Sequence, residues 1–406
     1  MRAIAARGQP ARRVKLVGVT ERLYYTDSYL REFRARVTGR ADDGRRIYLE
    51  RSAFYPTSGG QPHDTGSIGG VPLVAVEDEG EAIAHLVAAP IENDEVDCRV
   101  DWDRRFDHMQ QHSGQHLLSA VFVEHFGVAT VSFHLGQESS TIDLDTAALE
   151  PARMLEAERR ANEVVCENRL LAVSFEDAAQ TRGLRKPSER EGTLRIVSIE
   201  GLDRSACGGT HVARTGEIGP ILLRKTERVR NTVRVEFLCG GRALRRARAD
   251  FDALSRVAQM VSVSLDEAPD VVAAQFEAAR QAEKLRRKLE TELAQVQGRE
   301  LYSSKAPDAD GVRRVWRRMP SGNLEDLRAI AQSFTAQARA VFAAALDDPP
   351  AVLLAASADS GLDAGKVLKA ALVEAGGRGG GNQRMAQGSL PSRALLDQVF
   401  GKLKTA

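Results

Sequence analysis

The sequence predicts an α+β protein built from four successive regions, which we place at residues 1–99, 100–241, 242–304 and 305–406. Three observations support this class. Short β-rich runs fill the first region, helical and strand-like patterns mix in the second and fourth, and a long helical pattern dominates the third. A chain of 406 residues, 43% of them hydrophobic, exceeds what one hydrophobic core normally serves, so several domains are expected.

Residues 1–99 are predicted to form a small β-barrel or curled sheet. Runs at residues 29–37, 46–49 and 71–76 are rich in residue types that favour strands, and Gly, Asp and Pro turns separate them. Short strands with frequent turns are typical of a sheet that closes or curls on itself.

The second region, residues 100–241, combines helices and strands. Apolar residues recur at helical spacing in residues 110–126, and residues 151–167 have the pattern of an amphipathic helix. Residues 194–199 and 232–238 alternate as half-buried strands do. This mixture predicts an α+β sandwich.

Residues 242–304 are predicted to be helical. Between residues 270 and 300, Ala, Leu and Val recur near heptad spacing among charged residues, with no proline inside, which is consistent with a coiled-coil arm. A solvated helix hairpin packed within one chain explains the same pattern. Such an arm would dimerise the protein, extend it towards a large ligand or do neither, and the sequence leaves these outcomes open.

The fourth region, residues 305–406, has an α/β pattern. The apolar run 351–355 predicts a buried strand, residues 364–374 predict a helix, and a Gly-rich loop is predicted at residues 376–381. The backbone N–H groups of such a loop suit a phosphate or a sugar–phosphate backbone, although a bare Gly-rich turn is the alternative. We therefore predict nucleic-acid contacts in and beside this loop, by Arg378, Gly379, Gly380 and Arg384.

Two short segments have the residue types and the spacing of a split transition-metal site. His112 and His116 are four residues apart in a predicted helix and so project from the same face, one turn apart. Cys207 and His211 repeat this spacing. Imidazole nitrogen and thiolate sulfur together favour Zn²⁺. Ser113 occupies the position where a zincin helix needs its Glu general base, which excludes that class.

Four motifs resemble the alanyl-tRNA editing family, which comprises free-standing editing proteins and the editing domain of alanyl-tRNA synthetase. They are residues 23–30, 54–66, 106–119 and 207–211, in the order that the family has. Residues 376–388 resemble the C-terminal domain, termed DHHA1, that alanyl-tRNA synthetase shares with DHH-type phosphoesterases and that helps the synthetase grip tRNA. No Asp-His-His tripeptide occurs in the chain, which argues against a second catalytic centre.

The resemblance implies a zinc-dependent editing domain at residues 100–241. Its reaction would be hydrolysis of the ester that joins an amino acid, wrongly Ser or Gly, to the terminal ribose of tRNA(Ala). Zinc suits this reaction because it lowers the pKa of bound water to about 7 and polarises the ester carbonyl. His112, His116 and Cys207 are the expected ligands, and His211 is expected as a fourth ligand or as a neighbour that positions water. Four protein ligands would suggest a structural ion and three a catalytic one.

Three further residues are candidates to act at the same site. Thr57 and Ser58 are expected to line a pocket for small side chains and to recognise the Ser hydroxyl, although their segment serves almost as well as a turn between strands. The family commonly has Gly-Gly-Gly where this chain has Ser58-Gly59-Gly60, so the amino-acid preference is less defined than the reaction. His134 is expected to face the site, with a hydrogen-bonded core histidine as the alternative.

The implied partner is the acceptor end of tRNA(Ala). No aminoacylation unit precedes the editing region in this sequence, so the protein is expected to act in trans. Two other functions stay open: a nucleic-acid-binding module with a structural zinc, and a phosphoesterase that acts through the C-terminal region. A homodimer formed through the helical or the C-terminal region also stays open.

The composition of the chain limits the kinds of partner that it can bind and the cellular compartment in which it is expected. The net charge of +1, from 57 basic and 56 acidic residues, means that any nucleic-acid-binding surface must be local, and basic clusters at residues 242–248 and 313–318 are candidates. Four cysteines without a Cys-x-x-Cys pattern fit a reducing compartment. Without a signal peptide or a long apolar window, the sequence predicts a cytoplasmic protein with no membrane partner.

Overall fold

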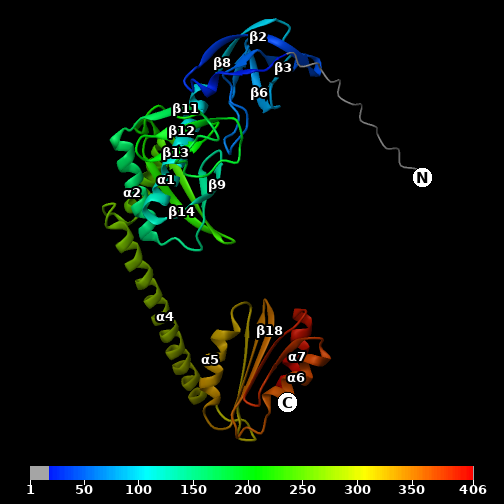
Figure 1. Ribbon diagram of the computed structural model, residues 1–406. Helices are drawn as coiled ribbons and strands as arrows, with labels where there is room; N and C mark the ends of the chain where they lie inside the picture. Colours follow the sequence, from blue (N-terminus) through cyan, green and yellow to red (C-terminus); the bar gives the residue numbers. More distant parts are fainter. Residues whose placement is uncertain (1–17, 406) are drawn as a thin grey trace, which may run out of the picture. The chain divides into compact units, whose positions relative to one another are not determined.

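The computed structural model describes residues 18–405 (Figure 1), which divide into two compact units between Arg256 and Val257. The predicted regions 1–99 and 100–241 share the first unit, and the predicted helical region is divided between the two. The molecule is an α+β protein, as the sequence predicts. Among the described residues, no helix is both long enough and apolar enough to cross a bilayer.

The first unit begins with a closed six-stranded barrel, drawn in blue in Figure 1, in the order β2-β3-β7-β6-β5-β8. The expected barrel is therefore confirmed. Strict alternation in β8 turns Val96, Cys98 and Val100 inward, because successive side chains of a strand point to opposite faces. The short elements beside the barrel are β1 (Glu21–Arg22), β4 (Arg51–Ser52) and the 3₁₀ turns at Leu23–Tyr25 and Asp42–Gly44. The barrel strands are β2 (Glu32–Ala41), β3 (Arg46–Leu49), β5 (Gly66–Ile68), β6 (Val71–Asp78), β7 (Ile83–Val87) and β8 (Glu95–Val100).

A central helix, α1 (Trp102–Phe126), follows the barrel and organises the rest of the unit. It starts eight residues earlier than the predicted helix at 110–126, because the side chain of Asp101 caps it by accepting from the Arg104 amide. It ends at Gly127, whose left-handed φ of 65° closes the last turn. From Gln111 to Phe122 every residue of this helix is buried, so its polar residues must find partners inside the protein.

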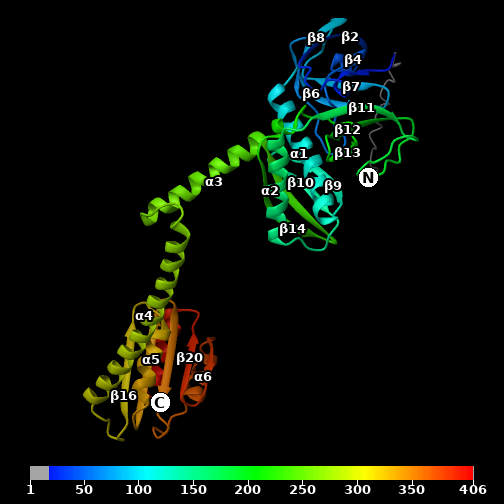
Figure 2. The same ribbon diagram turned by 60° about the vertical axis from the view of Figure 1, so that its left-hand side comes forward.

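Two sheets and a second helix surround α1, as Figure 2 shows. One sheet has the order β14-β15-β10-β9 and the other β11-β12-β13. The predicted strands at 194–199 and 232–238 correspond to β12 and β15, and the predicted helix at 151–167 is α2. The elements are β9 (Thr130–Leu135), β10 (Ser140–Leu144), α2 (Pro151–Glu167), β11 (Leu171–Asp177), β12 (Thr193–Ile199), β13 (Asp203–Ala206), a 3₁₀ turn (Thr215–Ile218), β14 (Ile221–Val229) and β15 (Thr232–Cys239).

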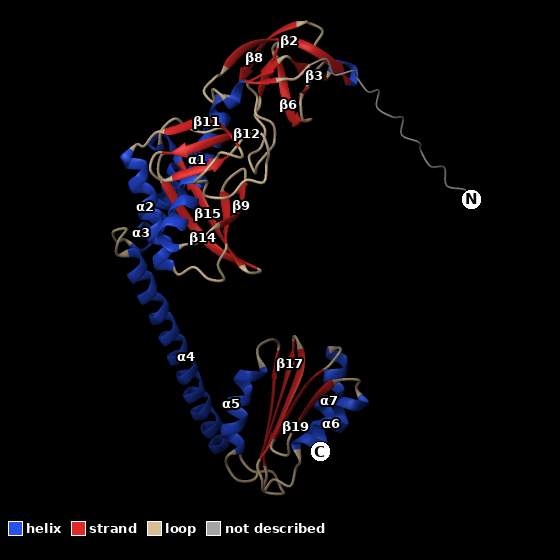
Figure 3. Ribbon diagram, in the orientation of Figure 1, coloured by secondary structure: helices blue, strands red, loops and turns tan. Residues whose placement is uncertain are grey.

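The second unit is a three-layer α/β domain (Figure 3). Its sheet has the order β16-β17-β18-β20-β19, with α4 and α5 against one face and α6 and α7 against the other. The predicted strand at 351–355 lies in β18, and the predicted helix at 364–374 is α6. The elements are α4 (Ala268–Ser304), β16 (Arg313–Met319), α5 (Leu324–Thr335), β17 (Ala340–Asp347), β18 (Pro350–Ala356), α6 (Ala364–Glu374), β19 (Arg378–Gly381), β20 (Met385–Ser389) and α7 (Arg393–Thr405).

The predicted helical region consists of α3 (Gly240–Val261) and α4, a single helix of 37 residues. The C-terminal part of α4 packs on α5, and Ala294 is buried in this contact. A Cβ on Gly298 would lie 2.5 Å from Ser333 Cβ, so the two helices are in close contact at this glycine. Long exposed helices need such tertiary support, because propensity alone stabilises them little. The coiled-coil interpretation and the homodimer stay predictions.

The prediction of a Gly-rich loop at residues 376–381 is wrong for most of this range, because Arg378–Gly381 form the edge strand β19. A Cβ on Gly379 would lie 2.4 Å from the Gln387 carbonyl oxygen, and one on Gly381 would lie 2.1 Å from the Met385 carbonyl oxygen. Gly379 and Gly381 are therefore required by close packing against β20, whereas a Cβ on Gly380 would have no neighbour within 4 Å. Glycine weakens strands in general, so its local preference indicated a loop.

Candidate metal centre

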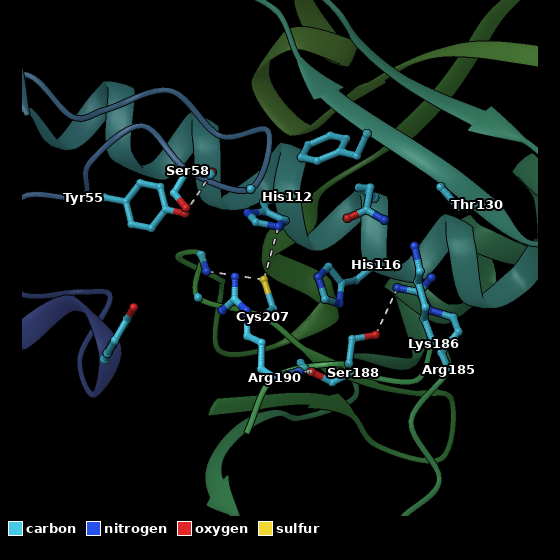
Figure 4. Close-up of a pocket in the computed structure, with 18 of the residues that line it drawn as sticks. Tyr55, Ser58, His112, His116, Thr130, Arg185, Lys186, Ser188, Arg190 and Cys207 are labelled. Atoms are coloured by element: carbon cyan, nitrogen blue, oxygen red, sulfur yellow. Dashed lines mark hydrogen bonds between the residues drawn. The ribbon is translucent and has the colours of Figure 1, made fainter. Parts of the chain in front are cut away.

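Four side chains from distant parts of the first unit, His112, His116, Cys207 and His211, converge at one point. Figure 4 labels three of them, His112, His116 and Cys207. His112 and His116 come from one face of α1, while Cys207 and His211 lie in the loop after β13. One nitrogen or sulfur of each residue lies within 4.8 Å of the corresponding atoms of the others. The Cys207 Sγ is 3.4 Å from His112 Nε2 and 3.3 Å from His211 Nε2. The two segments singled out in the sequence therefore meet in space.

Each imidazole is oriented by a partner on its other nitrogen. The Nδ1 of His112 is 2.8 Å from Gln61 Oε1, that of His116 is 3.0 Å from Asp203 Oδ2, and that of His211 is 3.1 Å from Ser113 Oγ. These contacts leave all three Nε2 atoms free on the side of the Cys207 thiol. Outer partners of this kind fix the ring and its tautomer, which is typical of histidines that bind a metal.

Gln61 links the barrel side of the unit to the centre, and the sequence analysis missed it. It lies in the same Gly-rich segment as Thr57 and Ser58, whose hydroxyl groups make them the candidates that the sequence indicates. Its Nε2 donates to Thr210 Oγ1 over 2.9 Å, so the amide is held from both ends. The amide backbone of Thr210 also donates to Gln61 Oε1 over 3.3 Å. The only sign of this role in the sequence is that Gln61 is a polar residue directly after Gly59 and Gly60.

Asp203 was also missed, because a lone carboxylate at the start of a strand has no distinctive spacing. Its second oxygen accepts from Arg185 Nε at 2.8 Å, and its carboxylate also accepts from the Ser205 hydroxyl. A chain of contacts thus runs from Arg185 through Asp203 to His116. Such a buried network holds one arrangement only when every polar group in it has a hydrogen-bond partner. Arg185, Asp203 and His116 each have one here.

The electrostatics of the cluster favour a thiolate. Burial raises the pKa of the Cys207 thiol, but the imidazoles of His112 and His211 outweigh it and hold that pKa well below its usual range. Burial lowers the pKa of His116, yet the hydrogen bond to Asp203 raises it to about 9. Burial lowers the pKa of His211 to about 3. Transition metals bind the thiolate and the neutral imidazole, so metal binding would displace the proton that His116 holds at neutral pH.

The donor set fits a borderline-soft divalent ion. A tetrahedral ion with bonds of 2.0–2.3 Å separates its ligand atoms by about 3.5 Å, which the two contacts of Cys207 approach. Three imidazole nitrogens and one sulfur are ligands that zinc accepts. His211 belongs to the cluster as closely as the other three residues do.

A cleft of about 380 Å³ opens above the cluster. His112, His116 and Cys207 line it, whereas His211 does not and so lies beneath the other three. An ion held by the four residues would be open to the cleft on one side. Catalytic zinc sites have three protein ligands and keep a further position for water or substrate.

Ser58 is the one member of the three further candidates that lines this cleft. Thr57 does not line it, and its hydroxyl accepts from the His63 amide instead. The prediction that His134 faces the site is wrong. In β9 the neighbouring Phe133 turns towards His112, with ring centroids 5.3 Å apart, and alternation points the exposed His134 to the other face of the strand.

The four residues predicted to contact nucleic acid all lie in the second unit. Arg378, Gly379 and Gly380 belong to the edge strand β19, and Arg384 lies in the turn before β20. All four are exposed. In that turn, Asn382 Oδ1 accepts from the amides of Arg384 and Met385, which holds the turn without any ligand.

Comparisons with known proteins agree with this centre. A profile of the second additional domain of threonyl- and alanyl-tRNA synthetases matches residues 194–236, which contain Cys207 and His211. The chain is 37% identical over 238 residues to the alanyl-tRNA editing protein Aarsd1 of Danio rerio, covering 56% of this chain and 57% of that protein. For Aarsd1 of Bos taurus the identity is 35% over 241 residues, 54% of each chain. Alanine–tRNA ligase of Pyrococcus abyssi is 32% identical over 404 residues, covering 93% of this chain and 42% of the ligase. The chain spans about half the length of the curated relatives it matches.

Proposed function

We propose that this chain, which belongs to the family of the alanyl-tRNA editing proteins, hydrolyses the ester bond between the wrong amino acid and tRNA(Ala). The substrate is Ser-tRNA(Ala), with Gly-tRNA(Ala) as the second candidate, and the enzyme is a zinc-dependent aminoacyl-tRNA deacylase. The observation that carries the proposal is the convergence of His112, His116, Cys207 and His211, the first three of which line an open cleft. The partner is the acceptor end of tRNA(Ala).

The four converging residues would hold the zinc ion. When bound there, zinc would supply a water molecule of lowered pKa and polarise the ester carbonyl. The protein's own contribution is orientation: Gln61, Asp203 and Ser113 fix the three imidazoles before substrate arrives. Pre-formed geometry of this kind lowers the reorganisation that the reaction needs.

The cleft also provides a place for a small amino-acid side chain. Ser58 lines it from the Gly-rich segment, and Phe133 closes the side next to His112. A hydroxyl partner at Ser58 favours Ser over an amino acid without a hydroxyl, because a hydrogen-bonding site rejects analogues that leave it unpaired. The aromatic wall limits the length of the side chain that can enter.

Purified protein incubated separately with Ser-tRNA(Ala) and Ala-tRNA(Ala) tests the proposal. We expect release of Ser and retention of Ala. The double variant Cys207→Ala and His116→Ala should lose both the zinc and the release of Ser, while His134→Ala, outside the cleft, should retain both. Undiminished release of Ser by the double variant would contradict the assigned site.

A nucleic-acid-binding module with a structural zinc is the second candidate, and the number of converging donors favours it. Four protein ligands are typical of structural sites. The same incubation separates the two functions, because a structural zinc predicts tRNA binding without ester hydrolysis. The phosphoesterase alternative has less support: within residues 18–405, the His, Cys, Asp and Glu side chains form one metal-competent group, and it lies in the first unit.

A further inference from the structure

One wall of the cleft is the loop of residues 178–192, which joins β11 to β12. Arg185, Lys186, Ser188 and Arg190 line the cleft from this loop. The opposite wall comes from the Gly-rich segment and β9. Figure 4 shows these side chains directed into the cleft, with Arg190 on the side of Cys207 and Lys186 on the side of Thr130. The loop therefore presents cations to both ends of the cleft floor.

The lining cations differ in whether a carboxylate already pairs with them. Arg22 pairs with Asp78 through two contacts of 2.8 and 2.9 Å, and Arg185 pairs with Asp203. Among the described residues, no carboxylate oxygen lies within 4.0 Å of the Lys186 ammonium or the Arg190 guanidinium. Both side chains are exposed. Their charged donors are therefore free to bind an anion that enters the cleft.

The proposed substrate brings such an anion to a defined place. An amino acid esterified to the terminal ribose of tRNA shares that ribose with a phosphodiester on its 5′ side. When the ester lies over the metal cluster, this phosphate must lie on the other side of the same ribose, within the cleft or at its rim. Charged donors of Arg and Lys are the usual partners of phosphate oxygens.

We infer that Lys186 and Arg190 bind the phosphodiester that precedes the aminoacylated ribose. The inference rests on the proposed function and names the part of the substrate that the loop recognises. Arg185 has a different task, because its guanidinium is occupied by Asp203 and so supports the orientation of His116. The loop thus combines a phosphate contact with a positioning contact, made by different residues.

Two substrates separate a phosphate contact from every other role of the loop. Ser-tRNA(Ala) carries the phosphate, whereas 3′-O-seryl-adenosine carries the same ester without it. For the double variant Lys186→Ala and Arg190→Ala, we expect the ratio of kcat/KM on Ser-tRNA(Ala) to that on seryl-adenosine to fall about tenfold or more, through KM. The single variant Arg190→Lys keeps the charge and should therefore retain most of the wild-type ratio of the two kcat/KM values. Arg228→Ala, an exposed arginine outside the cleft, serves as the matched control.

Direct binding gives a second measurement that needs no hydrolysis. A fluorescent oligonucleotide ending in CCA should bind the wild-type protein with a salt dependence whose slope the double variant reduces by about 0.7, because both residues contact the same phosphate of a single strand. An unchanged slope together with an unchanged kinetic ratio would overturn the inference. Equal losses on both substrates would also overturn it, because they indicate a damaged centre. If the wild-type protein releases Ser from neither substrate, the proposed function fails, and the oligonucleotide measurement still decides whether the loop binds phosphate.

Discussion

Gly209 shows how closely the residues around the four converging side chains are packed. A Cβ at this position would lie 2.2 Å from His112 Cε1 and 2.4 Å from His112 Nδ1. The neighbouring Gly208 has ordinary space, since its nearest neighbour would be the Tyr25 hydroxyl at 3.6 Å. Two adjacent glycines thus differ in what they permit, although the sequence presents them as one Gly-Gly turn.

We predict that Gly209→Ala weakens zinc binding about 10- to 100-fold, because the added methyl displaces the His112 ring from its contact with Gln61. Gly208→Ala should bind zinc as the wild-type protein does. Competition with a chromophoric chelator measures both affinities. Equal affinities in the two variants would contradict the packing argument.

Among the structural elements, α1 is tied to the Gly-rich segment by a fully buried ion pair. Arg105 and Asp64 have no exposed side-chain surface, and the Arg105 Nε is 3.1 Å from both Asp64 oxygens. Arg105 also donates to the Ser28 and Ala53 carbonyls, while Asp64 accepts from the Tyr55 amide. Breaking such a pair strands a charge in the interior.

Replacing Arg105 with Met should lower the free energy of unfolding of the first unit by about 3–5 kcal/mol, because Asp64 is left buried and unpaired. Adding Asp64→Asn should restore part of this loss, since the amide keeps an acceptor for Tyr55 without a charge. Arg104→Met is the control: this arginine is half-buried and donates one hydrogen bond, to the His63 carbonyl. Urea titrations measure all three. A loss no larger than that of the control would argue against the role of the pair.

The barrel contains a buried histidine whose protonation should weaken it. Burial lowers the pKa of His85 in β7 to about 4, and its ring contacts Ser52 Oγ over 2.8 Å. In the unfolded chain this pKa is about 6.5, so the unfolded state binds more protons between pH 6.5 and 4. The contribution of neutral His85 to the free energy of unfolding is therefore complete above pH 6.5 and is lost as the pH falls towards 4.

At pH 5 the contribution of His85 to this loss is about 2 kcal/mol. His85→Gln should reduce the difference in unfolding free energy between pH 7 and pH 5 by this amount, whereas His125→Gln, at a partly exposed position on α1, should leave it unchanged. Denaturant titrations at the two pH values provide the measurement. The same pH dependence in wild type and His85→Gln would refute the argument.

For the whole chain, the division into two compact units predicts that the chemistry belongs to the first. All four converging residues and their outer partners lie before Arg256. A chain that ends at Val261, after α3, should fold, bind zinc and cleave seryl-adenosine with unchanged kcat/KM. Gel filtration, metal analysis and the ester assay check this outcome. Loss of cleavage would contradict this prediction, because it would show that the ester chemistry requires the second unit.

Features that depend on neighbouring residues could be predicted, while those that depend on distant ones could not. The i, i+4 spacing of His112 and His116 determines that both lie on one face of a helix, whatever packs around it. Gln61 and Asp203 gain their roles only by approaching these histidines across 51 and 87 residues of chain. Neither has a local pattern to reveal it.

By itself, the sequence determined the types and spacing of the four candidate donors, a barrel or curled sheet in the first region and the order of helices and strands, because these follow from local periodicity and donor chemistry. Only the tertiary structure decided that Phe133, and not His134, faces the cluster, that His211 lies beneath it, and that residues 378–381 form a strand. These outcomes depend on which faces pack together. Packing is a property of the whole folded chain, since each contact joins residues that are remote along it.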